Sequence, residues 1–210
     1  MGAIVYRRTA IDKYLSDLAG DMPAPGGGSA SALVAATGVS LLLMVVNFTV
    51  GRKGYEKDTA GVMRAKSVLR KIGRRLQALI DEDVRAYNKF ARFMKLPKES
   101  RDKDEKTAIL KNAASVPLEI CELCGTAVKE AEFLAAAGNK NLVTDVGCGA
   151  LCLEAGFNSA EINALINLKY VDDAEYVSRV RGALSSDRAS LGRAVKGIMQ
   201  YLDTKVLTTG

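Results

Sequence analysis

The sequence has no histidine and no tryptophan among its 210 residues, and only 6% of its residues are aromatic. The absence of histidine excludes a Ser-His-Asp triad, a Cys-His pair, a histidine-ligated metal and an imidazole acid or base with a pKa near neutrality. If this protein is a catalyst, its proton transfers must therefore use carboxylates, Lys, Cys, Tyr or bound water.

The chain also lacks a strong excess of charge, since 30 Lys and Arg face 24 Asp and Glu for a net charge of +6. No Lys- or Arg-rich block is interleaved with aromatic residues, so we predict no nucleic-acid partner. The first twelve residues contain no apolar run followed by a small-residue cleavage site. We therefore expect no signal peptide, a cytoplasmic location and reduced cysteines.

No segment alternates polar and apolar residues convincingly, so the sequence predicts no sheet. Helical periodicity instead predicts an all-α protein, with residues 1–210 forming a single-domain helical bundle. The bundle is expected to have a central uncharged helix, two long helices and several shorter ones. Cap and turn residues place these helices at about 9–20, 28–50, 58–94, 102–137, 142–155, 158–170 and 172–202.

The uncharged stretch between residues 22 and 51 is long enough to span a bilayer. It is the only such stretch, and it carries several hydroxyl and amide side chains, as a central helix wrapped by other helices can. We therefore predict a core helix and no membrane association. A non-enzymatic, membrane-associated helical protein is the alternative. The polar residues in question are Ser29, Ser31, Thr37, Ser40, Asn47 and Thr49.

One carboxylate interrupts an apolar stripe in the predicted helix at 58–94. Asp83 follows Leu79 and precedes Tyr87, and all three share one face because helical neighbours recur every three or four residues. Burial raises the pKa of a carboxyl group toward the range where an acid or base is useful. Asp83 is therefore our candidate acid/base, and a buried ion pair is the alternative.

Asp145 interrupts a stripe in a similar way, although an aspartate near a helix start also caps the backbone and favours the helix dipole. A polar line formed by Ser159, Asn163, Asn167 and Tyr170 recurs at helical spacing. Its two amides can bind a polar heterocycle or each other across a helix interface, and the spacing leaves both alternatives open.

Two glycine-rich segments flank the uncharged helix. PAPGGGS at residues 23–29 feeds directly into the helix, so Gly26, Gly27, Gly28 and Ser29 can present backbone N–H groups to an anion or a cofactor. No Walker A lysine follows it. After the helix, Gly51, Arg52, Lys53, Gly54 and Tyr55 form a basic loop that is either a solvated turn or a carboxylate site.

The four cysteines occur as Cys121-x-x-Cys124 and Cys148-x-x-x-Cys152, which allows a four-thiolate zinc site. Both pairs lie inside predicted helices, whereas zinc-binding pairs of this kind sit on tight turns. We therefore interpret them as small buried hydrophobic residues, and a zinc-binding module is the alternative.

Several segments together resemble the formiminotransferase-cyclodeaminase C-terminal family. They occur in the family's order and cover nearly the whole chain, and the resemblance is closest to the free-standing bacterial methenyltetrahydrofolate cyclohydrolases. Gly54 stands where many relatives carry a lysine. The segments are PAPGGGS at 23–29, MVVNFTVGRKGY at 44–55, IDEDVRAY at 80–87, LPK at 96–98, VPLEI at 116–120, GNKNLVTD at 138–145 and NALINL at 163–168.

The resemblance implies an all-helical homodimer that acts without a metal on a tetrahydrofolate derivative, with or without a polyglutamate tail. The implied reaction is hydrolysis of 5,10-methenyltetrahydrofolate to 10-formyltetrahydrofolate, and a cyclodeaminase that releases ammonia is the alternative. Asp83 would act as acid/base, with Asp145 as a second carboxylate and Asn163 and Asn167 on the heterocycle. The substrate would also be lined by Gly26, Gly27, Gly28, Ser29, Asn47, Thr49, Gly51, Arg52, Lys53 and Tyr55.

Overall fold

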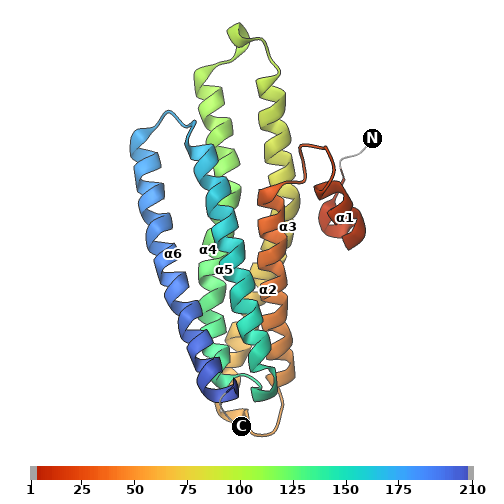
Figure 1. Ribbon diagram of the computed structural model, residues 1–210, viewed down its shortest axis with the longest axis vertical. Coiled ribbons are helices and arrows are strands. Elements are labelled where there is room, and N and C mark those ends of the chain that lie inside the picture. The colour runs from red at the N-terminus through yellow and green to blue at the C-terminus, as the bar shows by residue number, and fades with distance from the viewer. Residues whose placement is uncertain (1–3, 208–210) are drawn as a thin grey trace.

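Six α-helices, short 3₁₀ turns and a final π-helical turn (Asp203–Leu207) are joined by loops in residues 4–207, the part of the chain that the computed structural model describes (Figure 1). No strand occurs within this range, so the all-α prediction is confirmed. The helices are α1 (Ile11–Leu18), α2 (Gly27–Thr49), α3 (Thr59–Met94), α4 (Lys103–Ala137), α5 (Val143–Leu168) and α6 (Ala174–Leu202).

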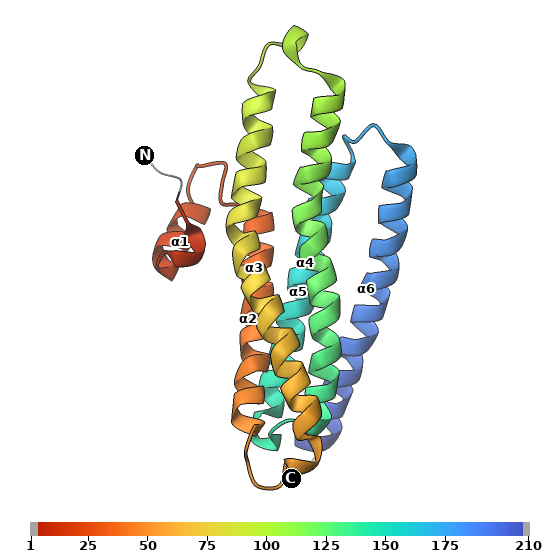
Figure 2. The same ribbon diagram turned by 180° about the vertical axis from the view of Figure 1, so that it is seen from behind.

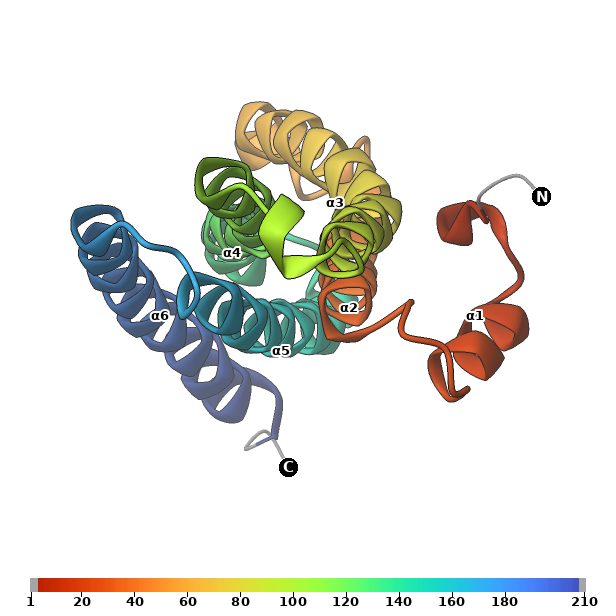
Figure 3. The same ribbon diagram turned by 90° about the horizontal axis from the view of Figure 1, so that it is seen from above.

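The five long helices form two layers. In Figure 1, α2 and α5 lie side by side in front of α3 and α4, and the view from behind in Figure 2 shows α3 and α4 in front. Seen from above in Figure 3, α6 flanks α4 and α5, whereas α1 stands apart beside the start of α2. The α3–α4 hairpin rises beyond the ends of α2 and α5.

The uncharged helix α2 packs on α3, α4 and α5, and its inner residues Ala35, Val39 and Leu42 are fully buried. Among the described residues it is the one helix long and apolar enough to cross a membrane, but 56% of that stretch is buried in the bundle, as in a core helix. The prediction of a helix wrapped on all sides is wrong for its outer face, where Val34 and Phe48 are exposed.

The predicted break between residues 155 and 158 does not exist, because α5 is continuous from Val143 to Leu168. Gly156 sits inside the helix, and a Cβ placed on it would lie 2.9 Å from the Cβ of Ala35, so this glycine allows α2 and α5 to approach closely. Glu161 also lies inside this helix and forms an ion pair with Arg188 of α6. This ion pair and the close contact with α2 are therefore made by one continuous helix, where the sequence predicted a boundary.

The predicted start of the first helix at about residue 9 is also early. The hydroxyl of Thr9 donates to the carbonyl of Tyr6, and the helix begins at Ile11 without a side-chain cap. The start of α4 agrees with prediction, since the Asp102 side chain accepts the N–H of Glu105 at 2.8 Å.

Candidate active site

Three consecutive acidic residues in α3 point in three directions. Asp81 is 4% exposed, and its Oδ2 lies 3.3 Å from Nε of Arg7 in the N-terminal segment. Glu82 accepts two hydrogen bonds from Arg75, at 2.6 and 2.8 Å. Asp83 forms no ion pair with any residue in the 4–207 range and faces a cavity instead. The apolar-stripe argument therefore selected the one carboxylate of the three that has no cationic partner.

The Asp83 carboxylate is held against the first turn of α2. Its Oδ2 accepts the backbone N–H of Ser29 at 2.9 Å. A Cβ placed on Gly28 would lie 2.0 Å from Oδ1 of Asp83, so the two helices can meet in this way only with glycine at that position. Burial raises the pKa of Asp83, although the Ser29 N–H lowers it in part. A carboxyl group with a raised pKa holds its proton more readily than an exposed aspartate does, so it can act as an acid as well as a base.

The cavity beside Asp83 has a volume of about 290 Å³ and lies between the start of α2, the last turns of α5 and inner stretches of α3 and α4. The glycine turn forms one wall, the aromatic rings of Tyr87 and Phe90 form another, and two amides from α5 face them. None of the residues that line it is basic. The lining comprises Pro23, Ala24, Gly26, Gly27, Gly28, Asp83, Ala86, Tyr87, Phe90, Ala113, Asn163, Ile166 and Asn167.

The two predicted amides are held by backbone carbonyls and also line the cavity. The Nδ2 of Asn163 donates to the carbonyl of Ser159 at 2.8 Å, and the Nδ2 of Asn167 donates to the carbonyl of Ala113 at 3.1 Å. These bonds fix the amides within α5 and against α4. Both side chains also line the cavity, and their oxygens are left to accept hydrogen bonds from a ligand.

A residue that sequence reasoning missed supports the glycine turn from behind. Tyr14 of α1 is 4% exposed, and its hydroxyl lies 3.1 Å from Oγ of the fully buried Ser29. Burial raises the pKa of Tyr14, so its hydroxyl keeps its proton. Helix α1 is too short for its periodicity to reveal this contact. Tyr87 and Phe90 were also treated only as apolar stripe, although they line the cavity.

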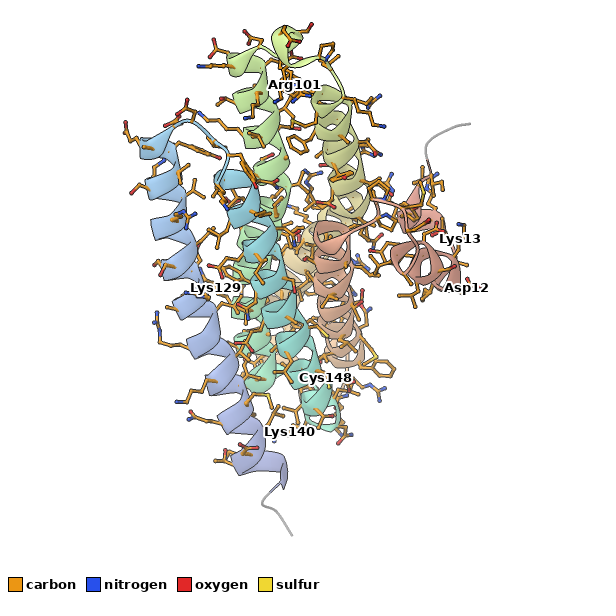
Figure 4. All side chains as sticks on the ribbon, turned by 45° about the horizontal axis from the view of Figure 1, so that its top comes forward. Asp12, Lys13, Arg101, Lys129, Lys140 and Cys148 are labelled. Carbon is orange, nitrogen blue, oxygen red and sulfur yellow. The ribbon has the colours of Figure 1, made fainter. Side chains whose placement is uncertain are left out.

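The other predicted substrate residues lie at the far end of α2. The backbone N–H of Asn139 donates to the hydroxyl of Thr49 at 2.9 Å, and that of Lys140 donates to the hydroxyl of Tyr55 at 3.0 Å. Figure 4 places Lys140 at this end of the bundle and Arg101 at the opposite tip. The 23 residues of α2 separate the two ends by about 33 Å. One chain therefore does not bring these residues beside Asp83, and their role in binding substrate stays a prediction.

The predicted site residues at this far end are Asn47, Thr49, Gly51, Arg52, Lys53, Tyr55 and Asp145. Asp145 occupies the first turn of α5, where a negative charge is favoured by the helix dipole, and so cannot act beside Asp83 of its own chain. Gly51 and Gly54 have positive φ angles of 72° and 92°, as the tight basic loop requires. Arg52 and Lys53 are exposed, and the Arg52 guanidinium lies 5.8 Å from the centre of the Phe48 ring.

The cysteines do not form the alternative zinc site. Cys121 and Cys124 are buried in α4, where burial raises the pKa of Cys124 to about 12, and Cys148 is exposed on α5. Among the residues that the structure describes, no group of three or more Cys, Asp or Glu side chains has the geometry to hold a metal ion. The thiols of α4 are small hydrophobic groups of the core.

A larger hollow of about 480 Å³ runs between α4 and α6. Acidic and basic side chains alternate along it, among them Glu122, Lys129, Asp187 and Arg193. It contains no carboxylate paired with fixed amides and aromatic rings. The smaller cavity at Asp83 is therefore the better candidate for chemistry, because polar groups converge there on an apolar wall.

Comparison with known proteins identifies relatives along nearly the whole chain. The family model described as formiminotransferase-cyclodeaminase matches residues 10–186. A methenyltetrahydrofolate cyclohydrolase from Methylorubrum extorquens is 32% identical over 201 residues, which cover 93% of this chain and 97% of that protein. A formimidoyltransferase-cyclodeaminase from Sus scrofa is 34% identical over 178 residues, which cover 82% of this chain but only 33% of that protein.

A solved structure has the same fold. The crystal structure of a formiminotetrahydrofolate cyclodeaminase from Thermotoga maritima matches with a TM-score of 0.80 and 29% sequence identity. The match covers 95% of this chain and 96% of that one. The likeness therefore extends over both the chain's length and its three-dimensional arrangement.

Proposed function

The chain belongs to the formiminotransferase-cyclodeaminase family, and we propose that it hydrolyses 5,10-methenyltetrahydrofolate to 10-formyltetrahydrofolate. The observation that carries this proposal is the likeness to a free-standing cyclohydrolase, which extends over 93% of this chain and 97% of that enzyme. Such a match leaves no large part of either protein without a counterpart. It places this chain in the one-carbon metabolism of folates.

The reaction begins with a cationic carbon held between N5 and N10 of the folate. Water adds to that carbon and loses one proton, which gives a neutral tetrahedral intermediate. The hydroxyl of this intermediate then gives up its proton as the carbonyl forms, the bond from the carbon to N5 breaks, N5 takes up a proton, and the formyl group stays on N10. One proton is released overall, so the enzyme must accept a proton from water and return one to nitrogen.

We assign these proton transfers to Asp83. As a carboxylate it accepts the proton of the attacking water and stabilises the cationic substrate, and as a carboxylic acid it returns a proton to N5. The raised pKa of Asp83 brings the two forms closer in free energy. The oxygens of Asn163 and Asn167 would accept hydrogen bonds from the heterocycle, and Tyr87 and Phe90 would cover its flat face.

We further propose that the reaction needs no metal ion, because the substrate carbon is already an electrophilic cation. Exhaustive dialysis against a chelator should leave kcat unchanged. We likewise propose that the protein is cytoplasmic, that its cysteines are reduced and that it forms a homodimer. The exposed apolar residues of α2 and α5 support the dimer, since monomers seldom leave such a surface uncovered.

The cyclodeaminase reaction is the second candidate, and the fold shared with the Thermotoga maritima cyclodeaminase favours it. It passes through a closely related tetrahedral carbon, but it expels ammonia from a formimino group while the same ring closes. The same acid/base could serve both reactions. The lining of the cavity contains no group that is specific to ammonia release.

Assays of the purified protein on both substrates test the proposal directly. Loss of the methenyl chromophore without ammonia release is expected for a cyclohydrolase. Ammonia release from 5-formiminotetrahydrofolate at a comparable kcat/KM would assign the second function instead. Inactivity on both substrates, in protein that is helical by circular dichroism, would overturn the proposal.

A further inference from the structure

The chain that precedes the bundle, residues 6–18, consists of a 3₁₀ turn (Tyr6–Arg8) and helix α1, and we call it the N-terminal strap. Figure 3 shows it beside the start of α2, apart from the five long helices. Each of its two elements buries one side chain, Tyr6 and Tyr14, and these two rings meet edge-on with their centres 5.6 Å apart. Because so little apolar surface holds the strap, its few polar contacts decide where it lies.

The first of these contacts fastens the strap to α3. The Asp81 side chain is 4% exposed, its Oδ1 accepts the backbone N–H of Arg7 at 3.4 Å, and its Oδ2 lies 3.3 Å from Nε of Arg7. Within residues 4–207, Arg7 is the one cation paired with Asp81, whose Oδ2 accepts no hydrogen bond. A buried carboxylate without its cation is unfavourable. The burial of Asp81 therefore holds Arg7, and with it the strap, against α3.

The second contact fastens the strap to the first turn of α2. Ser29 is the third residue of this helix, so its backbone N–H has no acceptor within the helix. Asp83 supplies that acceptor at 2.9 Å, while the Ser29 hydroxyl lies 3.1 Å from the hydroxyl of Tyr14. Ser29 is thus held from two sides, by the strap through its hydroxyl and by the acid/base through its N–H.

Both contacts lead to Asp83 without reaching the cavity. Asp81 and Asp83 are two positions apart on α3, so their side chains leave the helix in nearly opposite directions. Asp81 faces the strap and Asp83 faces the cavity. Neither Arg7 nor Tyr14 belongs to the lining of the cavity, so neither touches a ligand there. The strap instead connects the two elements, α2 and α3, whose contact orients the Asp83 carboxylate.

We propose that Arg7 is a positioning residue for the acid/base. By fastening the strap to Asp81, it keeps the Tyr14 hydroxyl on Ser29 and so holds the Ser29 N–H on Asp83. A carboxylate that must accept and return a proton works only in a fixed orientation, so release of the strap lowers the rate of the chemical step. This inference rests on the proposed function for the reaction that Asp83 performs.

A set of coupled variants tests the role of Arg7. Arg7→Gln removes the cation, and kcat should fall about three- to tenfold while KM changes less than about twofold. Addition of Tyr14→Phe should cause no loss beyond the larger single loss, because both substitutions release the same strap. In the Asp83→Asn background, Arg7→Gln should cause no further loss, because the group that it positions is already inactive. A purely structural role would lower kcat in that background as well.

Matched controls separate position from charge. Arg8→Gln makes the same change at the next residue, which is exposed and forms no ion pair within the described chain, and should leave kcat unchanged. Arg7→Lys keeps the cation and should recover most of the wild-type kcat. Asp81→Asn should lower kcat as Arg7→Gln does, because Arg7 acts through Asp81. If Arg7→Gln fails to fold, Arg7→Gln/Asp81→Asn replaces it, since that variant contains no unpaired buried carboxylate.

Hydrogen exchange at the Ser29 amide, followed by NMR, measures the contact with Asp83 itself. It should be faster in Arg7→Gln than in wild type and unchanged in Arg8→Gln. A folded Arg7→Gln with wild-type kcat overturns the proposal, and so does a loss that multiplies with that of Tyr14→Phe or persists with Asp83→Asn. If the wild type turns over neither folate, the proposed function fails. Faster Ser29 exchange in Arg7→Gln alone would then leave the strap standing, and equal exchange in both arginine variants would overturn it too.

Discussion

The two ends of α2 differ in what their polar groups contact. At the Gly26–Ser29 end, the helix start presents a backbone N–H to Asp83, and the side chains around it open onto a cavity. At the Thr49–Tyr55 end, the buried Thr49 hydroxyl and the Tyr55 hydroxyl are bonded to the loop that precedes α5. Polar groups that face a cavity can act on a ligand, whereas those bonded within the chain fix its conformation. The comparison predicts that changes at the first end alter catalysis and changes at Thr49 alter stability.

Replacing the carboxylate should have the largest effect at the cavity end. Asp83→Asn keeps the shape of the side chain but removes the proton acceptor, so kcat should fall by about 10²- to 10⁴-fold. Its melting temperature at pH 7 should not fall, because burial disfavours the charged form of Asp83 in the folded state. Steady-state kinetics and a thermal melt measure both effects. A variant that keeps most of the wild-type kcat would remove Asp83 from its central role.

The next largest effects are expected from alanine substitutions in the glycine turn, and these effects should differ from one position to the next. A Cβ at Gly28 would lie 2.0 Å from Asp83, one at Gly27 would lie 3.0 Å from the Asn163 amide, and one at Gly26 would meet nothing within 4 Å. Gly28→Ala should therefore lower kcat/KM by roughly 10- to 100-fold through displacement of the carboxylate. Gly27→Ala should lower it only a few-fold, and Gly26→Ala serves as the matched control. Equal effects at all three positions would mean that flexibility of the turn, rather than its contact with Asp83, matters.

The pH dependence should reveal the raised pKa of Asp83. Because the base must be ionised, kcat/KM should fall on the acid side with an inflection above the ordinary aspartate value. For stability the sign is opposite to that of a salt-bridged carboxylate. The folded state holds the Asp83 proton more tightly than the unfolded state, so ionisation costs stability as pH rises through the folded pKa. The melting temperature of Asp83→Asn relative to wild type should thus increase from acid to neutral pH, and a constant difference would contradict a raised pKa.

The sequence predicted the fold and one wall of the cavity, but it did not predict how far apart the two ends of α2 lie. Asp83, Asn163 and Gly28 were found because each breaks a local pattern, and periodicity places such residues on a known helix face. Tyr14 was missed because its contact with Ser29 depends on how a short helix docks. Asp145 and Arg52 were assigned to the same site because a linear motif carries no information on which end of a bundle it occupies. That information resides in helix length and direction.

Removing the contact between α1 and the glycine turn should affect catalysis less than the changes at Asp83 and Gly28. Tyr14→Phe removes the hydroxyl that meets Ser29 at 3.1 Å but keeps the buried ring, which packs edge-on against Tyr6. Ser29 then loses one partner, and its N–H to Asp83 is less firmly held. We expect kcat to fall about two- to fivefold, with a stability loss of about 1 kcal/mol. If the acid side of the kcat/KM pH profile shifts in Tyr14→Phe, the effect passes through Asp83. If the profile does not shift, the role of Tyr14 is confined to packing.

The smallest effect on catalysis is expected at the opposite end of α2. Thr49→Val keeps the shape of a side chain that is 2% exposed but removes the hydroxyl that accepts the N–H of Asn139. An unpaired buried N–H costs about 1–3 kcal/mol, so denaturant unfolding should show a loss of that order while kcat changes less than twofold. Thr37→Val, on the exposed part of the same helix, is the matched control and should leave stability nearly unchanged, since its hydroxyl bonds only to its own helix. A large loss of kcat in Thr49→Val without loss of stability would erase the difference between the two ends. It would then assign this hydroxyl to the substrate, as the family resemblance alone first implied.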